Sequence, residues 1–170
     1  MKEPLDFGLL NDQNDNRFGE RPFGRFGTIG KNGCGMLALY NIERAANTAT
    51  RFDPFYDSRK PIKTNFFGLL GTRPSTIPKN LKNKGYTVQR ISPQKADAAE
   101  PFDGVIVLYW FWFGAHYVAG IATGDGRYTV YNHYASPKSV TLPDFLSELK
   151  RRKLHVYRIW GIRFPAQSKE

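Results

Sequence analysis

The sequence GCGMLALYNIERAANTAT, residues 33–50, predicts a helix that begins at Cys34, the only cysteine of this 170-residue chain. Apolar residues recur at helical spacing between Leu39 and Ala49, and small residues widen the same face, so this helix is expected to pack closely at the centre of the fold. A thiol at a helix N-terminus faces unpaired backbone N–H groups and the positive end of the helix dipole, which favour the thiolate. The flanking glycines would let a substrate backbone come close. Cys34 is therefore a candidate nucleophile, and the alternative is a buried structural cysteine.

Two polar residues far downstream, His116 and Asn132, complete the set that nucleophilic thiol catalysis requires. They lie on two predicted strands, each eight residues from Gly124, so a tight turn at residues 123–126 would place them directly across from each other. The side-chain carbonyl of Asn132 would then accept the imidazole N–H, and the other ring nitrogen would take the thiol proton. Taken singly, His116 could be a half-buried core histidine and Asn132 an ordinary turn residue, so the predicted triad depends on all three residues together.

The predicted donors to a tetrahedral oxyanion lie beside the nucleophile. One is the backbone N–H of Cys34, and the second is the side-chain amide of Asn32, two residues earlier. The alternative role for Asn32 is helix capping or turn formation, because Asn-Gly is a strong turn signal.

Other candidate groups do not form a site. His133 is predicted to point to the opposite face of its strand from Asn132, and His155 is isolated on the last predicted strand. Neither paired cysteines nor a close histidine pair predicts a metal site, and no P-loop or dinucleotide-binding glycine pattern occurs, so we expect no metal and no cofactor. The aromatic run 110–113 is expected mainly in the core, with alternate side chains available to line a substrate cleft.

The net charge of +10 favours an acidic partner. The basic residues are spread along the chain except for one dense run, Lys150–Lys153, which follows a predicted helix and suits the negative end of its dipole. A solvated helix end, an acidic protein partner and nucleic acid are the open interpretations of this charge. No zinc-finger, helix-turn-helix or RNA-recognition motif supports the last.

Cysteine content and hydropathy bear on location. A single cysteine excludes an intramolecular disulfide, and no secretory signal is visible, so we expect a cytoplasmic protein, or one exported without a cleavable signal peptide.

Residues 104–123 carry no formal charge and are numerous enough to span a membrane as a helix. Their β-branched and aromatic residues, and the interruption at 114–116, favour two strands instead. We therefore expect no membrane partner.

The chain is predicted to form an irregular N-terminal lead-in, residues 1–27, and a single domain, residues 28–165. Phenylalanines in the lead-in are expected to pin it to the domain surface, although a low-complexity arm is the alternative. Residues 51–74 are predicted to be irregular. The pattern predicts helices at 34–50, 75–84 and 142–150, and strands at 86–91, 105–112, 116–122, 127–132 and 154–164.

These motifs resemble those of the papain-like cysteine peptidases. Gly33-Cys34-Gly35 entering a helix, His116-Tyr117-Val118 on a strand and Val130-Tyr131-Asn132 on the next are most similar to the compact group related to bacteriocin-processing, double-glycine leader peptidases, over roughly residues 28–135. The resemblance implies Cys34 as nucleophile, His116 as general base and acid, and Asn132 as the orienting residue. That group often has Asp at the last position. It usually has a glutamine about six residues before the nucleophile, where this chain has Thr28, so Asn32 would have to substitute as oxyanion donor.

The expected architecture is an α+β papain-like domain, in which the helix that carries Cys34 packs on an antiparallel sheet. The leading prediction is a cysteine peptidase that cleaves a peptide or amide bond of a peptide or protein substrate through an acyl-enzyme on Cys34. A first alternative keeps the triad for deamidation or transfer, for example in a bacterial polymorphic toxin effector bound by an acidic immunity protein. A second alternative is a non-catalytic binding domain on the same scaffold.

Overall fold

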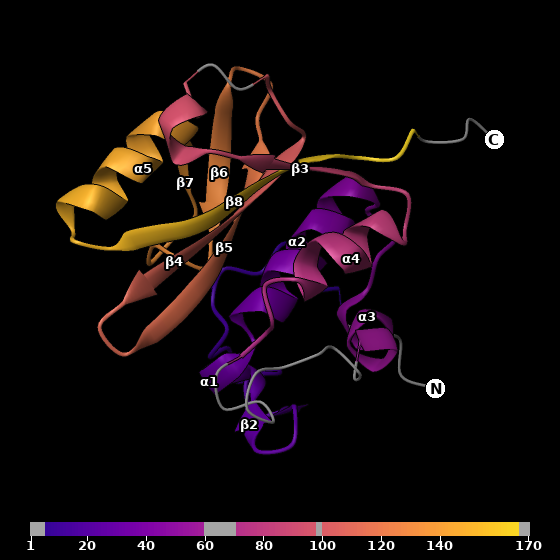
Figure 1. Ribbon diagram of the computed structural model, residues 1–170. Coiled ribbons are helices and arrows are strands. Elements are labelled where there is room, and N and C mark those ends of the chain that lie inside the picture. Colours follow the sequence, from indigo (N-terminus) through magenta and orange to yellow (C-terminus); the bar gives the residue numbers. More distant parts are fainter. Residues whose placement is uncertain (1–5, 60–70, 98–99, 167–170) are drawn as a thin grey trace.

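A six-stranded antiparallel sheet, in the order β3-β8-β4-β5-β6-β7, organises the fold (Figure 1). The computed structural model describes residues 6–59, 71–97 and 100–166. The sheet strands are β3 (Thr87–Ile91), β4 (Gly104–Phe111), β5 (Gly114–Ala122), β6 (Arg127–Tyr131), β7 (Lys138–Thr141) and β8 (His155–Arg163), and a separate pair is formed by β1 (Pro22–Phe23) and β2 (Gly27–Thr28). The helices are α1 (Ile29–Asn32), α2 (Cys34–Ala46), α3 (Phe52–Arg59), α4 (Thr76–Lys82), η2 (Pro93–Lys95, a 3₁₀ helix) and α5 (Leu142–Arg151).

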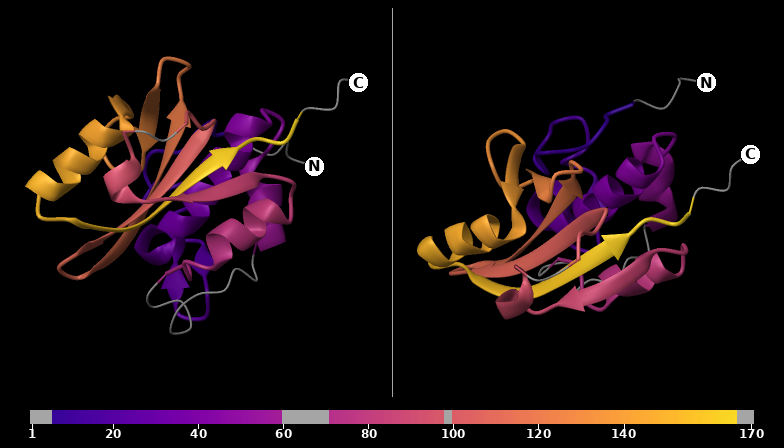
Figure 2. Two further views of the ribbon diagram at one scale, coloured as in Figure 1. Left: turned by 45° about the horizontal axis from the view of Figure 1, so that its top comes forward. Right: turned by 90° about the horizontal axis from the view of Figure 1, so that it is seen from above.

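The two faces of the sheet pack into two separate hydrophobic clusters, because successive side chains of a strand point to opposite faces. On one face, the side chains of α2, α3 and α4 bury Ile106, Leu108 and Trp160. On the other face, α5 buries Val107 and Ile159. Figures 1 and 2 show α2, α3 and α4 grouped together and α5 apart from them. The sheet is thus covered on both faces, as its long apolar strands require.

Helix α2 is the central helix that the sequence predicts. All ten residues from Cys34 to Glu43 are buried, so the apolar stripe lies against β5 while the remaining sides of the helix are covered by other segments. The helix ends at Ala46, earlier than the predicted end at residue 50, because Asn47 adopts an extended conformation (φ −143°) while its N–H still bonds to Glu43 O.

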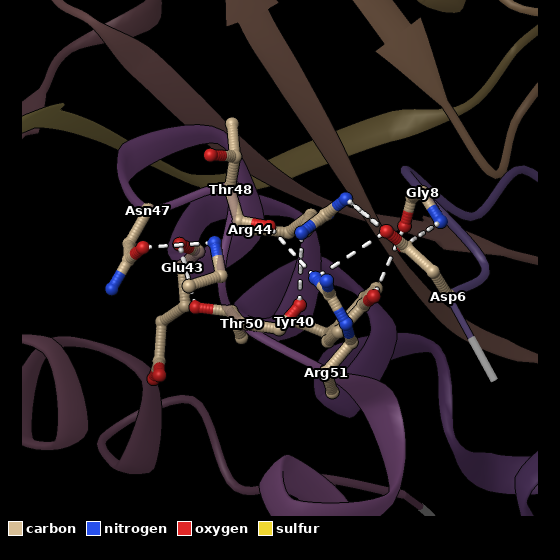
Figure 3. Close-up of polar contacts among 10 residues, drawn as sticks. Asp6, Gly8, Tyr40, Glu43, Arg44, Asn47, Thr48, Thr50 and Arg51 are labelled. Carbon is tan, nitrogen blue, oxygen red and sulfur yellow. Dashed lines mark hydrogen bonds and ion pairs between the residues drawn. The ribbon is translucent and has the colours of Figure 1, made fainter. Parts of the chain in front are cut away.

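The N-terminal segment is tied to α2 by polar contacts. The carboxylate of Asp6 lies 2.9 Å from Arg44 and 3.3 Å from Arg51, and the Tyr40 hydroxyl donates to Gly8 O at 3.0 Å (Figure 3). Phenylalanines add to this attachment as expected: Phe18 and Phe23 are buried, whereas Phe26 is exposed. The predicted boundary between lead-in and domain at residues 27 and 28 stays a prediction.

Most predicted elements are present with small shifts at their ends, but several short ones were missed. These are α1, α3 and β7, together with the β1–β2 pair and η2. Helix α3 lies inside the segment 51–74 predicted to be irregular, of which residues 60–70 fall outside the described part of the chain. Residues 104–123 form β4 and β5 as predicted, and no helix within the described ranges is long and apolar enough to cross a membrane.

The register of the β5–β6 hairpin differs from the prediction. Ala119 pairs with Tyr131, and Ala122 pairs with Tyr128, so Asn132 is in register with Val118 and not with His116. The loop is centred on Asp125, because Gly124 (φ +90°) and Gly126 (φ +75°) both adopt left-handed conformations. The Asp125 side chain then accepts hydrogen bonds from Thr123 and Arg127. A loop centred one residue later shifts every cross-strand pair by two residues.

Candidate active site

The Cys34 side chain lies in the wall of a pocket of about 180 Å³ on the α2 face of the sheet. Cys34 is 6% exposed and opens α2. The pocket is lined by the α1–α2 junction, by the segment that follows residue 70 and by the turn end of the β4–β5 hairpin. The cysteine therefore sits where the tip of α2 meets the sheet.

Two opposing effects act on the Cys34 thiol. Burial raises its pKa, whereas the backbone N–H groups of Tyr117, Gly35 and Cys34 itself bond to the sulfur and lower it. Burial dominates, so the pKa of Cys34 is raised in the free protein. The sequence-based expectation of a thiolate stabilised by the helix terminus is therefore wrong for the free protein, because desolvation outweighs the N–H groups.

Thr72 packs directly against Gly35, the residue that follows Cys34. A methyl group built on Gly35 would lie 2.6 Å from Thr72 Oγ1, so only glycine fits at position 35. Thr72 is held by the Tyr117 hydroxyl, which donates to its carbonyl oxygen at 2.9 Å. Its own hydroxyl is buried and has no hydrogen-bond partner within the part of the chain that the structure describes.

Asn32 also lines the pocket, at the end of α1. Asn32 is partly exposed, and its side chain makes no hydrogen bond to another residue in the described ranges. The predicted alternative of side-chain helix capping is not seen, since α2 has no side-chain hydrogen bond at its N-cap, Gly33. The amide of Asn32 is thus free to meet a ligand in the pocket.

His116 lies in β5 and is held by a main-chain oxygen. Its Nε2 is 2.5 Å from the backbone carbonyl oxygen of Asn132. A carbonyl can only accept, so Nε2 carries the proton and Nδ1 keeps the lone pair of a base. Burial lowers the pKa of His116, and the bond to Asn132 only partly opposes this effect. The imidazole is therefore neutral over most of the physiological pH range.

The structure brings His116 and Asn132 together, but through different atoms from those predicted. The Asn132 side-chain amide donates to Gln13 Oε1 at 3.2 Å, and the Asn132 N–H donates to Asn11 Oδ1 at 2.9 Å. Asn132 has left the strand and adopts a left-handed conformation (φ 62°), which Asn tolerates better than most residues. In this conformation the Asn132 carbonyl oxygen contacts His116, while the Asn132 side chain bonds to Gln13.

Cys34 and His116 approach the same stretch of β5. Ala115 and Tyr117 line the Cys34 pocket, whereas the ring of His116 packs edge-on against Tyr109, with centroids 5.6 Å apart. A negative charge on the Cys34 sulfur would raise the pKa of the Tyr109 hydroxyl, so the sulfur is close enough to Tyr109 to act on it electrostatically. The ring of His116 contacts the same tyrosine. Both residues thus lie near one end of β5, but the His116 ring packs on the α5 face of the sheet, opposite the face that Ala115 and Tyr117 line. No hydrogen bond joins His116 to Cys34 within the described residues.

Sequence reasoning missed a polar network behind His116. The Tyr109 hydroxyl lies 2.8 Å from His133 Nδ1, and Arg152 Nη1 donates to His133 Nε2 at 3.2 Å. Burial and the positive charge of Arg152 lower the pKa of His133 to about 4. His133 follows Asn132 in sequence, so the polar pair Asn132-His133 directly after a strand was the signal that could have indicated it. His155 takes no part and is exposed at the start of β8.

Within residues 6–59, 71–97 and 100–166, no three His, Cys, Asp or Glu side chains come together in a way that could hold a metal ion. No family model matches the chain, and no curated protein matches it in sequence.

The fold of this chain is similar to that of a solved peptidase domain. One similar structure is the peptidase domain of Streptococcus ComA, a bi-functional ABC transporter involved in a quorum-sensing pathway. It aligns with a TM-score of 0.51 and 13% identity, over 77% of this chain and 90% of that domain. The peptidase domain of Streptococcus mutans ComA aligns over 82% and 96%, with a TM-score of 0.46 and 13% identity. The predicted α+β fold, in which the helix that carries Cys34 packs on an antiparallel sheet, is confirmed by the first of these structures, and at this identity the likeness concerns the fold alone.

Proposed function

We propose that this protein is a cysteine peptidase that uses Cys34 as nucleophile and His116 as general base and acid. The observation that carries the proposal is the hydrogen bond from His116 Nε2 to the Asn132 carbonyl, because it leaves Nδ1 as a base on the same end of β5 that contacts the Cys34 sulfur. The shared fold with peptidase domains supports the same reaction class.

In the proposed mechanism, the resting pair consists of a neutral thiol and a neutral imidazole. The raised pKa of Cys34 and the lowered pKa of His116 both favour this state. As the sulfur attacks the carbonyl carbon of the substrate, its proton moves to His116 Nδ1, so that charge develops only in the transition state. The imidazolium then protonates the leaving amine, and a water molecule activated by His116 hydrolyses the thioester.

The oxyanion is proposed to form beside the start of α2. The Cys34 backbone N–H and the Asn32 side-chain amide would donate to it, because both border the pocket at the helix terminus. Asn132 would act as a positioning residue through its carbonyl, since its side chain bonds to Gln13.

The test is cleavage of a random peptide library, with products identified by mass spectrometry. We expect new termini from the wild-type protein and none from Cys34→Ala or His116→Ala. The exposed His155→Ala serves as the matched histidine control and should cleave normally. A one-dalton gain without new termini would instead establish deamidation. If no product forms and Cys34 is not covalently labelled, the protein is a non-catalytic binding domain instead.

The acidic protein partner, as an inhibitor or immunity protein, stays a prediction from the charge of +10.

A further inference from the structure

We propose that one end of the sheet, formed by the β4–β5 turn and the α5–β8 turn, docks onto an anionic lipid bilayer. The inference uses no proposed catalytic residue, so it stands or falls independently of the peptidase activity.

The β4–β5 hairpin ends in an aromatic tip, Trp110–Phe113, that is exposed and not buried in the core as expected. Trp112 is 91% exposed and Phe113 is 88% exposed, and Trp110 and Phe111 are each more than 40% exposed. Tyr157 of β8 extends the patch, since its ring packs edge-on against Trp110 with centroids 6.0 Å apart. Large exposed aromatic side chains gathered at one point of a soluble surface mark an interaction site.

A basic turn, Lys150–Lys153, lies at the same end of the sheet. It leads directly into β8, whose first residue, His155, pairs with Trp110 of the tip. Figures 1 and 2 show the hairpin and the α5–β8 turn at this same end. All four basic residues of the turn are exposed.

Further cations border the aromatic tip itself. Arg158 lies over the Tyr157 ring at 5.0 Å, and Lys31 lines the pocket that Phe113 also lines. Two acidic side chains near this turn already lie close to cations: Glu148 pairs with Arg152, and Asp97 lines a hollow with Lys150.

A bilayer fits this arrangement better than a soluble acidic partner. The tip is a convex two-residue turn, and a rigid protein would need a matching apolar hollow to cover it. A bilayer instead offers an anionic layer for the basic residues and an apolar layer beneath it for the aromatic rings. The uncharged hairpin can therefore enter the interface while the cations remain at the headgroups, which also places the mouth of the Cys34 pocket near the membrane surface.

The test is binding to large unilamellar vesicles, measured by co-sedimentation and by the tryptophan emission of the protein, to which the exposed Trp112 contributes. One vesicle type is pure phosphatidylcholine, and the other contains about 30 mol% phosphatidylserine, which gives a surface potential like that of a cytoplasmic leaflet. We expect binding and a blue shift of the emission with anionic vesicles only. Cys34→Ala should bind like the wild type.

Two sets of variants separate the aromatic and the basic contributions. Trp112→Ser with Phe113→Ser should weaken partitioning at least about ten-fold, whereas Trp112→Phe with Phe113→Trp should preserve it. Lys150→Gln, Arg151→Gln and Lys153→Gln together should weaken it on the order of a hundred-fold, at about five-fold for each charge. Arg152 is left intact because it contacts His133.

A matched triple variant controls for net charge. Lys79→Gln, Lys82→Gln and Arg90→Gln remove the same charge from exposed positions on α4 and β3, and should retain most of the binding. Equal loss in the two triple variants, or unchanged binding after loss of Trp112 and Phe113, would overturn the proposal. So would vesicle-independent, salt-sensitive binding to polyglutamate or duplex DNA, which would reassign the surface to an acidic protein or to nucleic acid.

Discussion

The side-chain amide of Asn132 donates to Gln13 Oε1 at 3.2 Å, across 119 residues of sequence. Asn11 accepts from the Asn132 N–H in the same way, and its own amide donates to the carbonyl of Tyr134 at 3.0 Å. The N-terminal segment therefore fixes the loop that follows β6, and with it the carbonyl that holds His116. A segment predicted from its composition as a lead-in contributes to the positioning of the proposed base.

Substitution of Asn132 tests whether its carbonyl or its side chain orients His116. Asn132→Gly keeps the carbonyl and accepts the left-handed conformation, so kcat/KM for the cleaved peptide should stay within about ten-fold of the wild type. Asn132→Val disfavours that conformation and should cost about 10²-fold or more. If Asn132→Gly loses as much activity as Asn132→Val, the side chain is the orienting group after all.

The reactivity of Cys34 should report a raised pKa. We expect the rate of alkylation by iodoacetamide to be low at pH 6 and to keep rising above the ordinary thiol range, because burial disfavours the thiolate. The unfolded protein in urea, where the thiol titrates normally, provides the reference. Fast alkylation at pH 6 that disappears in His116→Ala would instead reveal a preformed ion pair.

His133 should make folding stability depend on pH. Its pKa is about 4 in the folded protein against 6.5 when unfolded, so between these values only the unfolded state binds the proton. The free energy of unfolding should therefore fall as pH falls, by about 2 kcal/mol between pH 7 and pH 5 from this residue alone. Urea titrations at both pH values should show a smaller difference for His133→Gln. If the free energy of unfolding changes equally with pH in the wild type and in His133→Gln, the His133 imidazole is not held neutral in the folded protein.

Thr72→Val should stabilise the protein, which is uncommon for a buried substitution. Removal of a buried hydroxyl without a partner should raise the free energy of unfolding by about 1 kcal/mol. Thr50 is the control, because its hydroxyl donates to Glu43 O, so Thr50→Val should lower the free energy by about 1 kcal/mol. Destabilisation by Thr72→Val would mean that the hydroxyl has a partner in solution.

Asn32→Ala should reduce kcat by about 10²-fold and leave KM nearly unchanged, since an oxyanion donor acts mainly in the transition state. The melting temperature should not change, because the Asn32 side chain makes no hydrogen bond within the described ranges. The neighbouring Lys31→Gln should keep kcat. Unchanged kcat in Asn32→Ala would leave backbone N–H groups as the oxyanion donors.

Much of the fold was predictable because its elements carry strong periodic signals. The apolar stripe that follows Cys34 indicated α2, and the uncharged run 104–123 indicated β4 and β5. Short elements such as α1 and β7 were missed, since a few residues cannot show a period and such segments are stabilised by their neighbours. The exposure of Trp112 and Phe113 was equally unpredictable from the sequence, because an aromatic run has the same pattern in a core as at a hairpin tip.

By itself, the sequence determined the chemistry available to this protein: one thiol at a helix start, His116 on a strand and Asn132 after the next. The tertiary structure decided which atoms meet. The conformations of Gly124 and Gly126 shifted the β5–β6 register, so a main-chain carbonyl and not the Asn132 side chain reaches His116. Burial of Cys34 reversed the expected direction of its pKa, because desolvation depends on every surrounding element and leaves no local signal in the sequence.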